Sequence, residues 1–357
     1  MKIVQLVFHL GSGGAEKFVV DLSNELARQG HEVTLIMLRN KDEARFNLNC
    51  RFVADNVKLQ SLNIPEGFCF KYIPIVERAV LDENPDVVHA HLNILPYIMR
   101  LMFCHKNIRF IHTIHNLAQV ENPSAIQMHI CKWFYRNKYV IPVTISDICD
   151  QSFRDYYRLD CSVKINNGRS VPEKSENYAK IVDELSKLPR PLFVHVARRS
   201  KEKNQELLLR AFAKLDKPYT LLILGGGYDE DSAIKNLASD NVHFLGTVPN
   251  VGDYLYCADA FCLSSLVEGM PISLIEAMAC GLPSICTPAG GIPNMIVQSK
   301  TGFVSNDFSL DAYAAALKLF FDYEFDGKLI KDTYRARYSI RTCAHNYLKL
   351  YHSSITE

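Results

Sequence analysis

Two glutamates, Glu268 and Glu276, stand in the segment SLVEGMPISLIEAMACGLPSI, which otherwise consists mainly of apolar and small residues. A carboxylate in such surroundings needs a partner, because burial of an isolated charge is unfavourable. Sugar hydroxyl groups are suitable partners, and backbone N–H groups at a nearby helix start bind anions. The segment therefore indicates a site for a polyhydroxylated or phosphorylated ligand.

A predicted strand, loop and helix would hold the two glutamates. The preceding run DAFCLSS, residues 259–265, is typical of a short buried strand. Pro271 suits the first turn of a helix, Gly281 suits its end, and a proline two residues later forbids continuation. We therefore expect Glu268 on a strand-to-helix loop and Glu276 inside an interior helix. The helix start would direct free backbone N–H groups outward from Gly269, Met270 and Ile272.

Two cations, Arg198 and Lys203, follow the predicted strand PLFVHVA in the segment VARRSKEKN. In open parallel sheets the ligands bind at the carboxyl ends of the strands. Two positive side chains at that edge could neutralise a diphosphate without a metal ion. The alternative is a solvated charged loop, because Arg199, Lys201 and Glu202 are charged as well.

The segment GSGGAEK follows the first predicted strand and opens a helix. Gly13 and Gly14 would let backbone N–H groups approach a phosphate or a sugar closely. The segment is not a dinucleotide fingerprint, because that motif needs glycine where Glu16 stands, and no Walker lysine and serine pair follows. A tight turn between strand and helix is the simpler alternative.

An acidic segment, YDED, contains the pair Asp229 and Asp231, a spacing that can hold a divalent cation beside a diphosphate. It leads directly into the helical pattern SAIKNLA. A capped and acidic helix start explains the segment more simply, and we predict capping.

Four histidines stand in the segments HAHLN and HTIHN. No cysteine or carboxylate nearby completes a zinc site with them. His89 and His91 would share one face of a strand at the ligand-bearing edge of the sheet. We expect one or two of the four, which also include His112 and His115, to face a ligand as hydrogen-bonding or proton-transfer groups. The others would bind core backbone.

The composition excludes several classes of protein. At 357 residues the chain is long enough for two domains with separate cores. The net charge of +1 and the lack of a basic stripe argue against nucleic acid as a partner. The 11 cysteines show no CxxC spacing and often lie in apolar runs, which indicates reduced thiols in a cytoplasmic protein.

Three segments bear on contact with a membrane. The start MKIVQLVFHL resembles a signal peptide, but Gln5 and His9 interrupt its apolar run and we predict a strand. No run of 18 apolar residues exists, so no membrane-spanning helix is expected. Basic and aromatic residues mix in residues 100–110 and 131–139 and could contact an anionic membrane surface. A half-buried helix with an adjoining loop is the simpler interpretation of these two segments.

Strand-like and helical patterns alternate along the chain, which is typical of βα units on parallel sheets. The alternation pauses in the polar, turn-rich residues 167–186, where we place a linker, and then restarts. We therefore predict an α/β protein with two Rossmann-like parallel-sheet domains, residues 1–172 and 173–340. An amphipathic C-terminal helix at residues 341–357 could pack back on the N-terminal domain.

In this order, the motifs resemble those of the retaining nucleotide-sugar glycosyltransferases with the GT-B fold, specifically glycosyltransferase family 4. The resemblance runs from GGAEKFVVDLSNELARQGHEV through DVVHAHL, HTIHN, VTISD and NNG to VARRSKEKN, LLILGGG and VHFLGTVPN. Its most specific part is the E-x7-E segment EGMPISLIEAMACGLPSI. The resemblance implies two domains facing a central cleft, the N-terminal one for the acceptor and the C-terminal one for the nucleotide sugar.

The resemblance assigns the donor-binding roles to residues of the second domain. Arg198 and Lys203 would hold the donor diphosphate, and Glu276 would hydrogen-bond the ribose. Glu268 would face the donor sugar, helped by the backbone of Gly269, Met270 and Pro271. No metal ion and no cofactor is implied beyond the nucleotide sugar, for which UDP is favoured over GDP.

The N-terminal domain would complete the reaction centre. Gly13 and Gly14 would form a glycine loop near the phosphate, and His115 would lie beside the acceptor and the transferring sugar. The family is thought to pass the acceptor proton to the leaving phosphate oxygen on the same face, so Glu268 is not assigned as a nucleophile. The implied catalytic group is Arg198, Lys203, Glu268 and His115.

Two departures from the family pattern bear on which sugar is bound. Arg199 stands where the family commonly has an apolar residue, and Asn294 where it commonly has glutamate. The implied acceptor is a glycan or lipid-linked glycan in surface polysaccharide biosynthesis, at the inner face of the membrane. The alternatives are a nucleotide-sugar epimerase of the same fold and a non-catalytic nucleotide- or glycan-binding protein.

Overall fold

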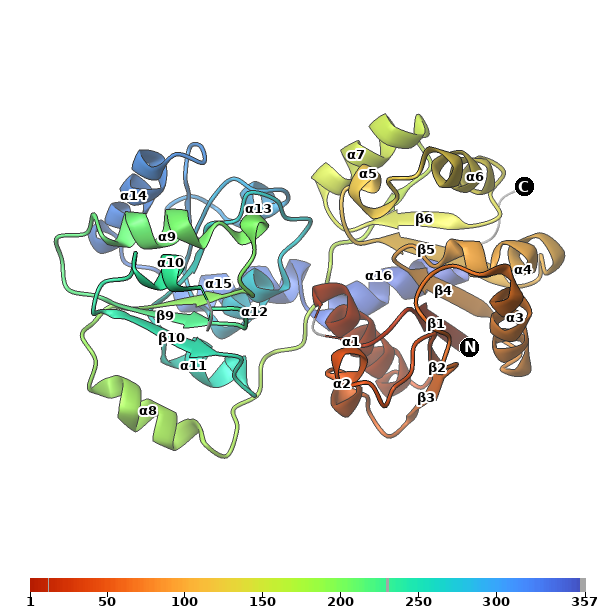
Figure 1. Cartoon of the computed structure of the whole chain (residues 1–357), viewed down its shortest axis with the longest axis horizontal. Helices are drawn as coiled ribbons and strands as arrows, with labels where there is room; N and C mark the ends of the chain where they lie inside the picture. Colours follow the sequence, from red (N-terminus) through yellow and green to blue (C-terminus); the bar gives the residue numbers. More distant parts are fainter. Residues whose placement is uncertain (12, 229–230, 354–357) are drawn as a thin grey trace. The chain divides into compact units, whose positions relative to one another are not determined.

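The computed structural model describes residues 1–11, 13–228 and 231–353, which form two compact units. The first unit holds residues 1–168 and the chain from Ile340 onward, and the second holds residues 169–339. Each unit contains one parallel sheet covered by helices (Figure 1). The predicted α/β class with two Rossmann-like domains is therefore confirmed.

The first unit is built on a seven-stranded sheet with the order β3-β2-β1-β4-β5-β6-β7. The strands are β1 (Lys2–Val7), β2 (Glu32–Met37), β3 (Val57–Ser61), β4 (Val87–His91), β5 (Arg109–Ile114), β6 (Ile141–Thr144) and β7 (Val163–Lys164). The helices are α1 (Gly14–Arg28), α2 (Ala44–Asn47), α3 (Ile73–Asp82), α4 (Met99–Cys104), α5 (Ala118–Glu121), α6 (Ala125–Arg136), α7 (Asp147–Tyr157) and α16 (Ile340–His352). Short 3-10 turns are η1 (Cys50–Phe52), η2 (Phe70–Tyr72) and η3 (Leu95–Tyr97).

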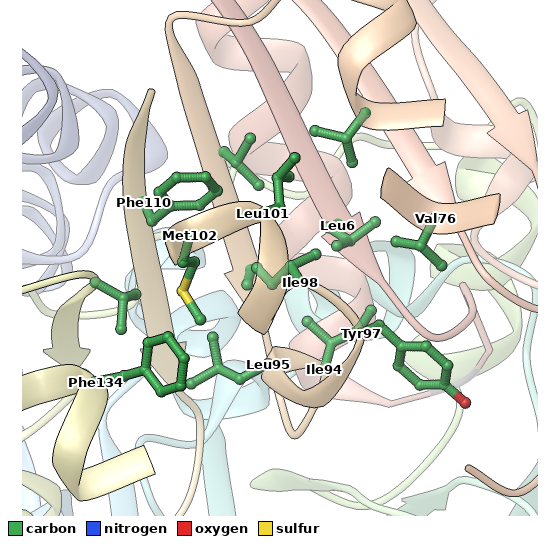
Figure 2. Packing of buried hydrophobic residues seen from close by; sticks show 14 of the residues in the cluster. Leu6, Val76, Ile94, Leu95, Tyr97, Ile98, Leu101, Met102, Phe110 and Phe134 are labelled. Atoms are coloured by element: carbon green, nitrogen blue, oxygen red, sulfur yellow. The ribbon is translucent and has the colours of Figure 1, made fainter. Parts of the chain in front are cut away.

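Successive residues of β1 serve the two faces of this sheet, because strand side chains alternate in direction. Leu6 joins an apolar core with Val76 of α3 and Met102 of α4, all three buried (Figure 2). Gln5 belongs to the other face, where its side chain contacts His91. The first unit therefore has an apolar core on one side of β1 and a buried polar cluster on the other.

Helix α16 packs against α1 and closes the polar face of the first sheet. The hydroxyl of Tyr351 lies 2.7 Å from Nδ1 of His89, and the hydroxyl of Tyr347 lies 2.8 Å from Oγ1 of Thr113. Arg109 donates from Nη1 to the carbonyl of Leu350 at 3.1 Å. The C-terminal helix is thus part of the first unit and supplies hydroxyl partners to His89 and Thr113.

The second unit is built on a six-stranded sheet with the order β10-β9-β8-β11-β12-β13. The strands are β8 (Leu192–Val196), β9 (Thr220–Leu224), β10 (Val242–Gly246), β11 (Ala260–Leu263), β12 (Ser284–Cys286) and β13 (Gly302–Val304). The helices and 3-10 turns are α8 (Tyr178–Ser186), η4 (Lys201–Lys203), α9 (Gln205–Phe212), α10 (Ser232–Lys235), α11 (Val251–Cys257), α12 (Ile272–Cys280), α13 (Ile292–Met295), α14 (Leu310–Leu319), η5 (Phe320–Asp322) and α15 (Gly327–Arg337). Helices α9 and α14 pack together on one face, and α8 and α11 on the other (Figure 1).

The segment expected to be a linker contains a helix. Residues 178–186 form α8, which packs against α11, and Tyr178 meets Tyr256 edge to face. Leu185 of α8 is buried. The amphipathic pattern of α8 follows a turn-rich sequence and therefore does not stand out as a helix. A helix this short depends on packing, here against α11, for its stability.

The strand order of each sheet reverses once, and such a reversal is a place where ligands can bind. In the first sheet the order reverses between β1 and β4, and in the second between β8 and β11. Loops leaving the carboxyl ends of such neighbouring strands part from each other and leave room for a ligand. The candidate residues Arg198, Lys203 and Glu268 follow β8 and β11, on either side of the second reversal.

Candidate active site

The loop that follows β8 carries the two predicted cations. Arg198 is exposed, and its carbonyl accepts from Nε2 of the fully buried Gln205 at 3.0 Å. A Cβ at Gly225, whose φ is +139°, would lie 2.1 Å from the carbonyl oxygen of Ala197, so only glycine permits this approach. Gln205 and the glycine turn after β9 therefore fix the backbone that presents Arg198.

Lys203 and Glu268 meet at the reversal of strand order. Nζ of Lys203 lies 2.6 Å from Oε1 of Glu268, and the hydroxyl of Ser265 donates to the same oxygen at 2.6 Å. The lysine side chain is 25% exposed and the carboxylate 8%. A ligand bound at this point would contact a cation and a hydrogen-bond acceptor that are already paired with each other.

Two hydrogen bonds and one close approach at a glycine hold the loops that carry this pair. The hydroxyl of Ser264 donates to the carbonyl of Lys203 at 2.9 Å, and the N–H of Leu266 donates to the carbonyl of Glu202 at 2.7 Å. A Cβ at Gly290, whose φ is +56°, would lie 1.7 Å from the carbonyl oxygen of Glu268. No local pattern around Gly290 predicts this role, because the requirement arises from a loop more than 20 residues away.

The predicted loop and helix around the two glutamates are present. Glu268 lies between β11 and α12, and Glu276 lies inside α12 and is 4% exposed. Pro271 is the N-cap of α12 rather than a residue of its first turn, and Gly281 ends the helix with φ +85°. The buried Met270 and the neighbouring loop residue Gly269 precede this start, and the carbonyl of Gly269 accepts from the N–H of Gly291 at 3.0 Å.

Glu276 is ion-paired with an arginine that the sequence motifs did not single out. Nε of Arg169 donates to Oε1 of Glu276 at 2.8 Å, with side chains 11% and 5% exposed. The backbone of Arg169 is held separately, since its N–H donates to the carbonyl of Tyr338 and its carbonyl accepts from the hydroxyl of Tyr334. The contact joins residues 107 positions apart, so no local pattern could reveal it.

The acidic segment before α10 behaves as a helix cap at its described residue. Asp231 accepts from the N–H of Ile234 at 3.1 Å, and its other oxygen accepts from Nε of Arg199 at 2.8 Å. This ion pair gives Arg199, one of the two departures from the family pattern, a structural partner. Asp229 lies outside the described residues. Within the described ranges, no three histidine, cysteine or acidic side chains converge as metal ligands would.

The glycine segment of the first unit begins α1. Gly13 is the N-cap with φ −75° and ψ 158°, and Gly14 is the first helical residue. A Cβ at Gly13 would lie 2.0 Å from Oε2 of Glu16, which is 7% exposed and whose other oxygen lies 3.5 Å from Nδ1 of His9. The backbone at Gly13 is ordinary, and a Cβ there would have to displace only the end of the Glu16 side chain, so the fold itself does not require glycine at this position.

Two of the four histidines are held entirely by the core. His89 contacts Tyr351 and Thr113, and burial lowers its pKa well below the ordinary value. His112 contacts Tyr135 and the carbonyl of Leu92, and burial lowers its pKa to about 4. Both imidazoles are neutral and hydrogen-bonded on both nitrogens, as expected for core histidines.

His115 follows β5 directly and lies in a different environment. Its backbone N–H donates to Oε2 of Glu121 at 2.7 Å, and its ring Nε2 lies 3.0 Å from Nδ1 of His91. Burial lowers the pKa of His115 to about 3 and raises that of Glu121 to about 8. Oε1 of Glu121 lines a small cavity with His112 and Cys131. Both groups are therefore neutral near pH 7.

The structure assembles the predicted residues in two sets. The second unit places Arg198 and Lys203 after β8 and Glu268 after β11, where Lys203 and Glu268 meet, and it places Glu276 inside α12 in an ion pair with Arg169. The first unit brings Gly13, Gly14 and His115 to the carboxyl ends of β1 and β5. A cation that follows one strand and a carboxylate that follows its neighbour can stabilise negative charge and orient hydroxyl groups, as transfer of a sugar from a phosphate requires.

Two known families together span most of the chain. Residues 12–168 match the family described as Glycosyltransferase Family 4. Residues 178–337 match the family described as Glycosyl transferases group 1. Helix α16 and the short connection between the units lie outside both matches.

Curated relatives agree with these matches. The N-acetyl-alpha-D-glucosaminyl L-malate synthase of Bacillus anthracis is 25% identical over 319 residues, which are 82% of this chain and 80% of the relative. The N-acetylgalactosamine-N,N'-diacetylbacillosaminyl-diphospho-undecaprenol 4-alpha-N-acetylgalactosaminyltransferase of Campylobacter jejuni is 28% identical over 310 residues, 80% of either chain.

Solved structures share the fold over nearly the whole chain. Sucrose-phosphate synthase of Thermosynechococcus elongatus has a TM-score of 0.78 at 19% identity and covers 98% of both chains. The Anabaena protein Alr3699/HepE in complex with UDP and glucose has a TM-score of 0.75 at 18% identity, over 98% of this chain and 99% of its own. The fold, the ordered motifs and the two family matches agree, and the chain belongs to the family 4 glycosyltransferases of the GT-B fold.

Proposed function

We propose that this glycosyltransferase moves a hexosyl unit from a nucleoside-diphosphate sugar, with retention at the anomeric carbon and without a metal ion. A UDP-sugar is the favoured donor, and the acceptor is a glycan or lipid-linked glycan of surface polysaccharide biosynthesis. The observation that carries the proposal is the meeting of Lys203 and Glu268 at the strand-order reversal of the second sheet, with the exposed Arg198 on the same loop as Lys203.

In this proposal the second unit binds the donor. Arg198 and Lys203 neutralise the diphosphate, since cationic side chains form the strong hydrogen bonds to phosphate oxygens. Glu268 turns its carboxylate from Lys203 toward sugar hydroxyls, and Glu276 accepts from the ribose. The UDP bound in the Anabaena neighbour supports UDP as the nucleotide.

Catalysis in the proposal rests on stabilisation of the leaving group. Negative charge grows on the diphosphate as the anomeric bond breaks, and preorganised cations lower the energy of that state. The loop around Lys203 is already fastened by Ser264 and Leu266, so little reorganisation is needed. The acceptor proton passes to the leaving phosphate oxygen, and no side-chain base is assigned.

The first unit would bring the enzyme to a lipid-linked acceptor. Helix α6 exposes an apolar stripe of Ile126, Ile130 and Trp133, spaced by four and three residues on one face. The helix contains no acidic residue, and Arg136 follows the stripe in its last turn. The diphospho-undecaprenol-linked acceptor for which the Campylobacter relative is named supports this assignment. We propose that α6 makes peripheral contact with the anionic inner face of the membrane. No helix in the described ranges has the length and apolar character needed to cross a bilayer.

Membrane contact is tested by sedimentation with vesicles. Replacement of Ile126 and Trp133 by serine should abolish binding to vesicles that contain anionic lipid, because apolar burial and basic charge act together. Leu329→Ser, at a comparably exposed position of the second unit, is the matched control and should bind as the parent does. Equal binding by the α6 variant would contradict the assignment.

The proposed activity is tested with UDP-, GDP- and ADP-linked hexoses and a lipid-linked sugar acceptor, with product stereochemistry read by NMR. We expect one donor to be consumed only when acceptor is present, with the anomeric configuration kept and with no effect of chelator. Conversion of the nucleotide sugar without acceptor would identify an epimerase instead. Donor binding without turnover would identify a non-catalytic protein, and loss of activity with chelator would promote Asp229 and Asp231 to metal ligands.

A further inference from the structure

Three side chains from three neighbouring strands form one hydrogen-bonded line in the first unit. Nε2 of His91, at the end of β4, lies 2.7 Å from Oε1 of Gln5 in β1. Nδ1 of His91 lies 3.0 Å from Nε2 of His115, which follows β5. Gln5 and His91 are both fully buried. The line therefore runs from the sheet interior to the residue expected at the reaction centre.

The direction of each hydrogen bond follows from the acceptor at its inner end. Burial lowers the pKa of both imidazoles far below neutrality, so each ring carries one N–H. The carbonyl oxygen of Gln5 only accepts, so His91 carries its hydrogen on Nε2 and accepts on Nδ1. His115 must then donate from Nε2, which leaves its Nδ1 as a bare acceptor.

That acceptor nitrogen is the outer end of the line. Nδ1 of His115 is buried and makes no hydrogen bond to any residue within 1–11, 13–228 and 231–353. The rest of His115 makes three contacts. Glu121 accepts from its backbone N–H, and His91 accepts from its ring Nε2. The ring of Phe18 lies 5.5 Å from the imidazole, centroid to centroid. A buried acceptor fixed in place and left unbonded is poised for a ligand donor.

We propose that Gln5 and His91 are positioning residues that lock His115 in one tautomer, so that Nδ1 of His115 accepts a hydrogen bond from a sugar hydroxyl. The inference rests on the proposed function for the presence of that sugar. His115 then binds and orients a hydroxyl group and neither donates nor removes a proton. Gln5 and His91 act only through it.

A pair of variants at His91 separates positioning from packing. In His91→Asn the amide oxygen can take the place of Nδ1 and accept from His115, whereas in His91→Leu a side chain of similar size offers no acceptor. Gln5→Met is a milder second variant, because it removes the acceptor for His91 while keeping a side chain of similar length.

The first readout is the nitrogen-15 spectrum of histidine-labelled protein, with the His115 signals identified by their loss in His115→Asn. We expect Nδ1 of His115 to be pyridine-like and Nε2 pyrrole-like in the parent protein and in His91→Asn, and a mixture of tautomers in His91→Leu and Gln5→Met. A pyrrole-like Nδ1 in the parent, or an unchanged spectrum in both His91→Leu and Gln5→Met, would overturn the proposal. This readout needs no ligand, so it stands even where the proposed function fails.

The second readout is affinity for the nucleotide sugar relative to the nucleoside diphosphate alone, with the acceptor KM measured in parallel. Loss of one neutral hydrogen bond should weaken binding roughly fivefold to tenfold in His91→Leu, while His91→Asn stays near the parent. A change confined to the nucleotide sugar assigns the hydroxyl to the donor, and a change confined to the acceptor KM assigns it to the acceptor. If neither the affinity for the nucleotide sugar nor the acceptor KM changed, the role for His115 Nδ1 would be overturned. A parent protein that binds no nucleotide would instead overturn the proposed function.

Discussion

The two units hold their candidate residues by opposite means. In the first unit the polar cluster is neutral and buried, with histidines whose pKa values burial has lowered and which are joined by hydrogen bonds. In the second unit the candidates are joined by ion pairs, namely Lys203 with Glu268, Arg169 with Glu276 and Arg199 with Asp231.

The difference indicates how each unit can bind a ligand. A buried neutral network is rigid, since an unmade hydrogen bond there is expensive. A partly exposed ion pair can exchange one partner for a phosphate or a hydroxyl at little net cost, because the charge stays compensated. We therefore expect the second unit to accept a charged ligand by partner exchange and the first to present a fixed surface.

The largest effect should follow from Lys203→Met, which keeps the length of the side chain and removes its charge. Turnover should fall by about two to three orders of magnitude, the usual loss when one preorganised stabiliser of the transition state is deleted. Steady-state kinetics measure this, and Lys201→Met, an exposed lysine of the same loop, is the matched control. A loss smaller than about fivefold would remove the diphosphate role from Lys203.

The neutral cluster of the first unit should make folding stability depend on pH. Comparison of Glu121→Gln with the parent protein tests this dependence. The folded pKa of Glu121 is about 8, above the ordinary 4.5, so the folded protein keeps a proton that the unfolded chain loses. Stability from this group is complete below pH 4.5 and is lost as pH rises toward 8. Each pKa unit corresponds to about 1.4 kcal/mol, so the loss should reach a few kcal/mol in the parent and be absent in the variant.

Melting temperatures of both proteins across this range measure the difference. The buried histidines have lowered pKa values, so their stabilisation is lost as pH falls below about 6.5, but they are common to both proteins and cancel. Parallel curves for parent and variant would show that Glu121 ionises normally.

Gly290→Ala tests how firmly the loop around Glu268 is held. Alanine at positive φ costs about 1–2 kcal/mol, and the contact with the Glu268 carbonyl should add roughly 1–3 kcal/mol of lost unfolding free energy. Gly246→Ala is the control, since Gly246 has φ +66° but no atom near a Cβ. Denaturant unfolding of both variants gives the contact term by difference, and equal losses would mean that the loop yields easily.

A smaller effect is expected from Arg169→Leu, which removes the ion-pair partner of Glu276 and leaves the backbone contacts of Arg169 in place. Affinity for the preferred nucleoside diphosphate should fall roughly tenfold, while affinity for its 2′,3′-dideoxy analogue should hardly change. Arg169→Lys should restore part of the difference. If parent and Arg169→Leu distinguish the two nucleotides equally, Arg169 does not orient Glu276.

The sequence was sufficient for the architecture because buried parallel strands are continuous apolar runs between helical patterns. The positions of Glu268 on a loop and Glu276 in a helix followed from Pro271 and Gly281, whose backbone preferences act locally. The helix at Tyr178 was missed, since its turn-rich approach resembles a linker until the packing partner Tyr256 is known.

The contacts that tune the site were beyond the sequence. His91 and Gln5 stand 86 positions apart, and Arg169 and Glu276 stand 107 apart. Such pairs depend on strand order, and strand order follows from packing of the whole unit rather than from any local pattern. The departure at Arg199 was visible from the sequence, but its explanation needed Asp231 in place.

The central claim is that the second unit binds a nucleoside diphosphate through Lys203 without a metal ion. Calorimetric titration of the parent protein and of Lys203→Met with UDP, GDP and ADP, each with and without chelator, tests it most directly. We expect that one nucleotide binds the parent protein, that chelator does not change its affinity, and that Lys203→Met binds it at least roughly tenfold more weakly. Binding that requires a divalent cation, or equal affinity in parent and variant, would contradict the account.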